Sequence, residues 1–140
     1  MIAKEPVAKI MTREVFTVEV GESLREAEMI MKRHKIRHMP VVREETLVGM
    51  LSLNDLLRLS FVDSYGYEAD ENIDTAIYQM LNIGQVMVAH PRTVQAAQPI
   101  REIAQIFVDE NFHALPVLEG DKLAGIVTTT DIIRYLLTQE

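Results

Sequence analysis

The apolar positions in the first half of the chain change spacing several times. A short apolar stretch at 15–18 predicts a strand. Apolar residues at helical spacing over 24–31 predict an amphipathic helix. Two further apolar runs, 39–42 and 47–51, flank a short polar turn and predict a β-hairpin. A last helix is predicted over 55–59, so the order is strand, helix, strand, strand, helix.

The same order occurs again 76 residues later. Residues 10–60 align with 86–136 without a gap, and twelve aligned positions are identical, including Pro40/Pro116 and Asp55/Asp131. About three identities are expected by chance over such a span. The second set of predicted elements is 93–94, 100–107, 115–118, 123–127 and 131–137. A repeat of this kind decides architecture before any local pattern does.

Local signals mark where some of these elements begin. Ser23 with Glu26 three residues later forms a capping-box pattern at a helix start. Pro99 suits the first helical position of the second copy. Pro40 and Pro116 cannot donate to a strand ladder, so we expect them at a strand start or on an edge.

The repeat predicts an α/β (α+β) fold with two tandem βαββα units. Its boundaries are residues 1–60 for the first repeat, 61–82 for a linker and 83–140 for the second repeat. A single copy would leave one face of its small sheet in water. We therefore expect the two copies to pack sheet to sheet about a pseudo-twofold axis. The linker has a predicted helix over Asp74–Leu81 and a predicted turn at 65–67.

Composition narrows the class of protein. The chain has 140 residues, no cysteine and no apolar run of 18 residues, which excludes disulfides, thiolate metal sites and a membrane-spanning helix. The first residues lack the pattern of a secretory signal, so we expect a cytoplasmic protein. The net charge of −7 argues against a nucleic-acid partner.

Charge is uneven along the chain. Residues 1–60 hold ten Lys/Arg against nine Asp/Glu, whereas 86–140 hold four against seven. The first copy is therefore the better place to look for an anion site. Residues 61–85 hold five acids and no base. This composition is consistent with a solvated linker or with a docking segment for a partner.

One motif with polar side chains suited to a functional site occurs in both copies. It is Gly-x-x-Ser/Thr-x-x-Asp, at 49–55 and 125–131. It places the hydroxyl of Ser52 or Thr128 three residues before Asp55 or Asp131, at a strand-to-helix junction. Such a pair is typical of a helix start, where the hydroxyl caps free amides. A helix N-terminus also attracts anions, and a carboxylate there can accept from ribose hydroxyls. Both interpretations stay open, because a duplicated cap would repeat too.

The ordered set of motifs resembles the cystathionine β-synthase (CBS) domain, twice. The set is an apolar-Met-Thr start, Thr-Val, an amphipathic helix, His/Arg-x-x-Pro-Val and Gly-x-x-Ser/Thr-x-x-Asp, over about residues 7–60 and 83–137. The resemblance implies a stand-alone CBS pair that binds AMP, ADP, ATP or S-adenosylmethionine reversibly in two clefts. It also implies a homodimer and a regulated protein partner, with no obligatory cofactor.

The resemblance also implies which residues line these clefts. Asp55 and Asp131 would hold ribose hydroxyls, while Ser52 and Thr128 would assist at the ribose or first phosphate. Thr12 and Phe16 would line one adenine slot and face Asp131, whereas Val88 and Arg92 would face Asp55. The expected nucleotide-binding residues are Thr12, Phe16, Arg37, His38, Ser52, Asp55, Arg92, His113, Thr128, Thr130 and Asp131. Since Ala114 replaces a polar residue and Arg92 replaces Phe16, the two clefts should differ.

These residues also have simpler interpretations. Arg37 and His38 could be polar loop residues, and Phe16 could belong to the core. His34 and His38 have the spacing of a metal pair, but no third ligand lies nearby in sequence, so no metal site is expected.

Phosphate-loop, dinucleotide-fold, zinc-protease and serine-hydrolase motifs are absent from the sequence, so we expect no enzyme activity. The alternative to a ligand sensor is a CBS-type interaction module without nucleotide binding.

Overall fold

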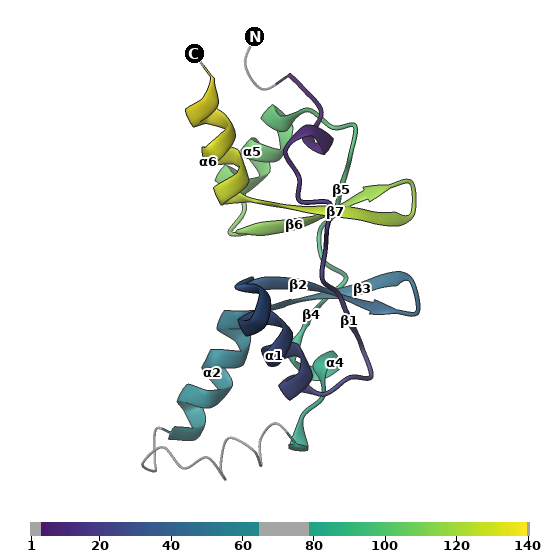
Figure 1. Ribbon diagram of the computed structural model, residues 1–140, viewed down its shortest axis with the longest axis vertical. Coiled ribbons are helices and arrows are strands. Elements are labelled where there is room, and N and C mark those ends of the chain that lie inside the picture. Colours follow the sequence, from purple (N-terminus) through teal and green to yellow (C-terminus); the bar gives the residue numbers. More distant parts are fainter. Residues whose placement is uncertain (1–3, 65–78, 140) are drawn as a thin grey trace. The chain divides into compact units, whose positions relative to one another are not determined.

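The computed structural model describes residues 4–64 and 79–139. The chain divides into two compact units (Figure 1). Unit 1 combines Met1–Val15 with Pro91–Glu140, and unit 2 is Phe16–His90. Each unit therefore has its own sheet and its own helices.

Unit 2 is built on a four-stranded sheet with the order β1-β2-β3-β4. β1 and β2 are parallel, whereas β2–β3 and β3–β4 are antiparallel. Its elements are β1 (Val18–Glu19), α1 (Leu24–His34), β2 (His38–Arg43), β3 (Thr46–Ser52), α2 (Leu53–Ser64), α4 (Ile83–Val86) and β4 (Val88–Ala89).

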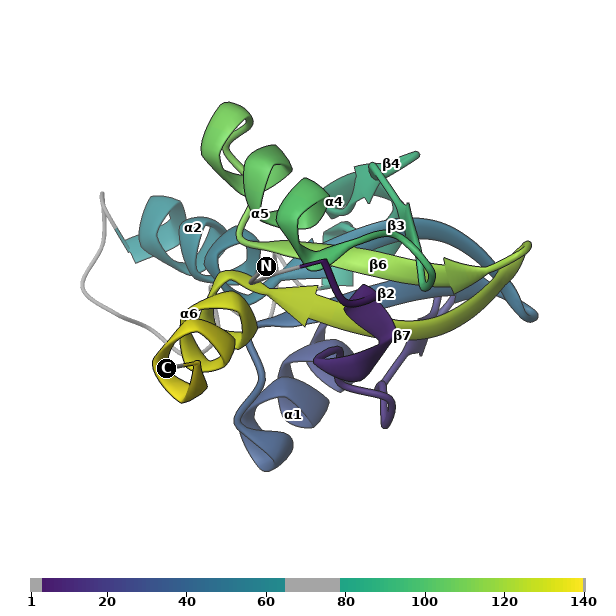
Figure 2. The ribbon, with the colours of Figure 1, turned by 90° about the horizontal axis from the view of Figure 1, so that it is seen from above.

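Unit 1 is built on a three-stranded sheet with the order β5-β6-β7, and the chain passes from β7 straight into α6 (Figure 2). β5–β6 is parallel and β6–β7 antiparallel. Its elements are η1 (Val7–Lys9), β5 (Val94–Gln95), α5 (Ile100–Asp109), β6 (Ala114–Glu119), β7 (Lys122–Thr128) and α6 (Thr129–Thr138). Strand, helix, strand, strand, helix therefore occurs in each unit, and the predicted fold class is confirmed.

The segment that precedes each repeat's first strand pairs with the sheet of the other repeat. Thr12 bridges Ile126 through two backbone hydrogen bonds of 2.8 and 3.0 Å. In unit 2, Val88 of β4 pairs with Met50 of β3. Unit 1 is thus discontinuous in sequence, whereas unit 2 is one continuous segment. Local periodicity did not show this, because it carries no information about strand partners.

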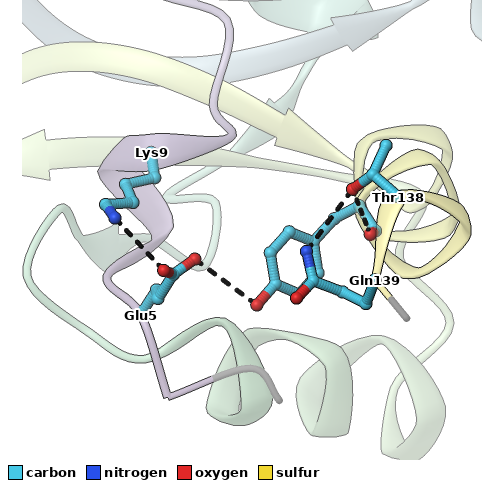
Figure 3. Close-up of polar contacts among 5 residues, drawn as sticks. Glu5, Lys9, Thr138 and Gln139 are labelled. Atoms are coloured by element: carbon cyan, nitrogen blue, oxygen red, sulfur yellow. Dashed lines mark hydrogen bonds and ion pairs between the residues drawn. The ribbon is translucent and has the colours of Figure 1, made fainter.

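Polar contacts also hold the N-terminal segment within unit 1 (Figure 3). Glu5 accepts from Lys9 Nζ at 3.1 Å and from the Tyr135 hydroxyl at 3.4 Å. The backbone of Ile100 donates to Glu5 O at 2.8 Å. Val7 is completely buried in the core of this unit. The segment is therefore an integral part of unit 1.

Of the predicted helix starts, the one at Ser23 is correct, whereas α2 and α6 begin two residues before the predicted 55 and 131. Ser23 caps α1 by accepting from the Glu26 amide at 3.1 Å. Pro99, expected at the first helical position, is the N-cap of α5 instead. Its ψ of 143° is extended, and it bridges Pro6 of the N-terminal segment, so the helix begins one residue later.

Pro40 and Pro116 each occupy the third position of a strand that has neighbours on both sides. β1 pairs only with Val41 and Val42, so Pro40 lies outside the part of β2 that β1 reaches. Pro116 has the same relation to β5, which pairs with later residues of β6. A missing donor is therefore tolerated inside these strands as it would be on an edge.

Each unit has its own apolar core. In unit 2 the core includes Leu24, Met39 and Leu51, all with no exposed area.

The predicted helix at 74–81 and the turn at 65–67 lie largely or wholly outside the described residues. In the described ranges, no helix is long and apolar enough to cross a membrane.

Candidate functional site

The strand-to-helix junction of unit 1 is closed by a reciprocal capping box. Thr128 Oγ1 accepts from the Asp131 amide at 3.1 Å, and Asp131 Oδ2 accepts from the Thr128 amide at 2.9 Å. Arg134 Nη1 lies 3.5 Å from the other carboxylate oxygen, Oδ1. Asp131 is buried, with 9% of its surface exposed. The carboxylate is therefore held in one orientation at the positive end of α6.

Unit 2 repeats this geometry with looser contacts. Ser52 Oγ accepts from the Asp55 amide at 3.1 Å, and Asp55 Oδ2 accepts from the Ser52 amide at 3.3 Å. Arg58 Nη2 lies 3.7 Å from Asp55 Oδ1. The Asp55 side chain is 19% exposed, compared with 10% for Asp131. Unit 1 therefore holds its carboxylate more tightly.

Helix capping accounts for only part of what these carboxylates can bind. The cap uses one oxygen of Asp131, and an ionised carboxylate has about four acceptor positions. The other oxygen, Oδ1, accepts from Arg134 at 3.5 Å, and the Arg134 side chain is 69% exposed. Capping and ligand binding by the same side chain are compatible, so neither sequence interpretation is eliminated.

The start of the first hairpin strand, β2 or β6, lies beside this junction in both units. His38 is opposite Ser52, and the Leu53 amide donates to Arg37 O at 2.8 Å. Arg37 and His38 thus lie next to the N-terminus of α2 and share the unit of Asp55.

Unit 1 has the equivalent arrangement. Ala114 is opposite Thr128, and the Thr129 amide donates to His113 O at 3.0 Å. His113 is therefore next to the N-terminus of α6, where Thr130 is exposed at the second helical position. The structure brings His113, Thr128, Thr130 and Asp131 together at one end of the β6–β7 hairpin.

The predicted slot residues divide between the units. Thr12 is exposed and belongs to unit 1 with Asp131, as its bridge to β7 requires. Phe16 belongs to unit 2, and its position opposite Asp131 stays a prediction. Arg92 belongs to unit 1, and its position opposite Asp55 stays a prediction.

Phe16 and Arg92 occupy equivalent positions in the two repeats, and each contacts an equivalent neighbour. The first pair is a stack of two rings, whereas the second is an ion pair. The rings of Phe16 and His34 stack with centroids 3.7 Å apart and an interplanar angle of 13°. Arg92 Nη1 donates to Glu110 Oε2 at 2.6 Å. The partners His34 and Glu110 were missed as neighbours of the site, yet they too lie 76 residues apart. Within the described ranges, no group of three or more metal-ligating side chains is present.

Comparison with known proteins gives the family. The model of the CBS domain matches residues 7–61 and 83–138. The chain belongs to the CBS domain family. The match covers both repeats and confirms the resemblance inferred from the motifs.

Relatives of this CBS-domain chain include longer proteins and proteins of similar length. The chain is 26% identical over 132 residues to the protein MJ1225 of Methanocaldococcus jannaschii, and the match covers 94% of this chain but 47% of that protein. It is 25% identical over 135 residues to the CBS domain-containing protein YhcV of Bacillus subtilis, a match that covers 96% of this chain and 87% of YhcV. The chain thus spans less than half the length of several curated relatives that it matches.

Solved CBS structures resemble the whole chain. CBSX2 in complex with AMP has a TM-score of 0.77 and 26% identity, with 95% of this chain and 96% of that chain covered. The CBS domain pair of MJ0100, in complex with 5′-methylthioadenosine and S-adenosylmethionine, has a TM-score of 0.72 and 26% identity, with 94% and 98% covered. A CBS domain from a membrane protein of Sphaerobacter thermophilus has a TM-score of 0.81 and 27% identity, with 99% and 91% covered.

Proposed function

We propose that this CBS pair is a sensor that binds adenosyl compounds at the strand-to-helix junctions. The observation that carries the proposal is the buried, oriented carboxylate of Asp131 beside Thr128. Structural relatives in the same family were solved with AMP, 5′-methylthioadenosine and S-adenosylmethionine. These ligands share an adenosine-type ribose, which is the part that a fixed carboxylate would recognise.

Each residue of the unit 1 site has a role in this proposal. Asp131 accepts hydrogen bonds from ribose hydroxyls through the capacity that its cap leaves unused. The hydroxyls of Thr12, Thr128 and Thr130 and the imidazole of His113 bind the polar parts of the ligand. In unit 2 the corresponding groups are Ser52, Asp55, Arg37 and His38, with the Phe16 ring available for stacking against a base.

Binding would act by shifting a conformational equilibrium. A ligand that prefers one of two arrangements of the chain raises the population of that arrangement, and a partner protein reads the change. The protein is proposed to work in the cytoplasm as a homodimer and without catalysis. Nothing in this mechanism requires a bond to break in the ligand.

Mass spectrometry of small molecules released from the purified protein tests this proposal. We expect a compound that contains adenosine, released in proportion to protein, with less released from Asp131→Ala. Incubation with ATP should then give no ADP above the level found with Asp131→Ala. Absence of any such compound, together with no binding of added AMP, ATP, 5′-methylthioadenosine or S-adenosylmethionine, would contradict the sensor.

The second candidate is an interaction module without a nucleotide. Large apolar side chains on α2 and α6 favour it, because each is more than half exposed: Leu57, Ile133, Leu136 and Leu137. The same side chains serve the proposed homodimer. Light scattering should report twice the 15.9 kDa chain mass, and Ile133→Glu should halve it. A dimer that binds no adenosyl compound would favour this second function.

A further inference from the structure

The segments that lead into β2 and β6 carry opposite charge. Residues 32–38, here called the basic segment, read Lys-Arg-His-Lys-Ile-Arg-His, with four Lys/Arg and no acid. Residues 108–114, the acidic segment, read Val-Asp-Glu-Asn-Phe-His-Ala, with two acids and no Lys/Arg. The two segments are equivalent in the repeat, so the two copies keep the same place and differ in charge.

Both segments end beside a candidate site. The carbonyl of Arg37 accepts from Leu53, the first residue of α2, at 2.8 Å. The carbonyl of His113 accepts from Thr129, the first residue of α6, at 3.0 Å. In unit 2 the basic side chains therefore add to the positive end of a helix, which attracts phosphate. In unit 1 the acidic side chains oppose it.

The cations of the basic segment are available to a ligand. Arg33, Lys35 and Arg37 are exposed and form no ion pair within the described part of the chain. Lys32, by contrast, pairs with Glu28 at 2.6 Å. Three exposed cations therefore lie within one short segment of unit 2.

The charges of the acidic segment are only partly neutralised. Glu110 pairs with Arg92 at 2.6 Å. Asp109 accepts from the neutral amide of Gln105 at 3.0 Å. Two carboxylates against one guanidinium leave the acidic segment with a net negative charge.

Building on the proposed function, we propose that the two sites take adenosyl ligands of different charge. The site beside the basic segment binds adenosine di- and triphosphates, whose phosphate chain lies against Arg37 and Lys35. Guanidinium groups bind phosphate oxygens through paired, charge-assisted hydrogen bonds. The site beside the acidic segment takes an adenosyl compound that lacks phosphate, such as uncharged 5′-methylthioadenosine or cationic S-adenosylmethionine, because the net negative charge of that segment repels a phosphate chain.

Calorimetric titration of the full chain with ATP and with 5′-methylthioadenosine tests the assignment. Arg37→Gln should lower the affinity for ATP about 10-fold, the loss of a hydrogen bond to a charged group. It should leave the affinity for 5′-methylthioadenosine within about twofold. The matched control is Arg43→Gln, which removes an exposed cation at the other end of β2 and should change neither affinity. Raising the salt concentration should weaken ATP binding alone.

A converse variant tests the acidic segment. Asp109→Arg with Asn111→Lys and His113→Arg copies Arg33, Lys35 and Arg37 at the equivalent positions and should give a second ATP site per chain. If Arg37→Gln and Arg43→Gln bind ATP equally while 5′-methylthioadenosine still binds, the assignment by charge is wrong and the proposed function stands. If the unaltered protein binds neither compound nor S-adenosylmethionine, both proposals fail.

Discussion

The carbonyl oxygen of Thr12 lies directly above Gly125, where a β-carbon would stand only 2.7 Å from it. The two residues are far apart in sequence, yet Thr12 also forms a pair of backbone hydrogen bonds with Ile126. Glycine at this position lets the N-terminal segment lie flat on β7. The equivalent Gly49 is covered by the side chain of Met87, as Gly125 is also covered by the side chain of Met11.

Gly125→Ala should therefore destabilise the protein. Overpacking a close-packed contact costs about 1–3 kcal/mol. The backbone oxygen of Thr12 is held by its bridge and cannot move aside as a side chain would. Urea unfolding of Gly125→Ala measures the loss, with Gly21→Ala as the matched control because a β-carbon at Gly21 would meet no atom within 4 Å. Equal stability of the two variants would show that the N-terminal segment does not pack closely on β7.

Gly120→Ala should also be destabilising, for a different reason. Gly120 has φ of +65° and open space around it, so an added β-carbon meets backbone strain alone. The left-handed conformation costs roughly 1–2 kcal/mol for a residue with a β-carbon. The equivalent hairpin residue Glu44 already bears this strain, at φ of 59°. Glu44→Gly should thus gain stability, or lose none, in a thermal melt where Gly120→Ala loses several degrees.

The segment before each repeat's first strand pairs with the other repeat's sheet, and this predicts which fragments of the chain can fold. A fragment of residues 1–60 lacks β4 and carries an N-terminal segment whose partner strand is missing. A fragment of residues 16–90 contains all of unit 2. We expect 1–60 to be unfolded or self-associating and 16–90 to retain more amide protection in hydrogen exchange. A cooperatively melting monomer from 1–60, with 16–90 unfolded, would contradict the division into these units.

Removing the cap of α6 should lower stability in the absence of ligand. Thr128→Ala deletes the hydroxyl that accepts from the Asp131 amide, and loss of an N-cap costs about 1 kcal/mol. Thr130→Ala is the control, because Thr130 is exposed in the first turn of α6 and is not the cap. Chemical denaturation without ligand gives both values. A Thr128→Ala protein as stable as Thr130→Ala would mean that the capping box contributes nothing to α6.

The sequence predicted the order of the elements within each repeat, although the strand expected at 15–18 forms only at Val18–Glu19. Apolar spacing located both hairpins and the helices α1 and α5, because each has one buried face. Apolar spacing could not predict that Met11 packs on Gly125 of the second repeat and Met87 on Gly49 of the first. Strand pairing at that point depends on glycine in the partner strand and on a two-residue bridge, and neither leaves a periodic signal.

For the candidate site, the sequence predicted the local geometry of the strand-to-helix junctions. The spacing of Thr128 and Asp131 anticipated both the cap and the oriented carboxylate. The facing of Phe16 with Asp131 and of Arg92 with Asp55 stays a prediction. The sequence did not show that the chain changes unit between residues 15 and 16 and between 90 and 91. That crossing point depends on tertiary contacts, which the linear motif does not contain.

The measurement that tests the central claim most directly is calorimetric titration of Asp131→Asn with 5′-methylthioadenosine or S-adenosylmethionine, whichever the unaltered protein binds. The amide keeps the size of the side chain and removes the charge that a ribose would recognise. We predict that affinity falls about 10- to 150-fold, while Asp121→Asn, in the exposed β6–β7 turn, binds as the unaltered protein does. Equal affinity of the two variants would contradict the account and leave Asp131 as a helix-capping residue.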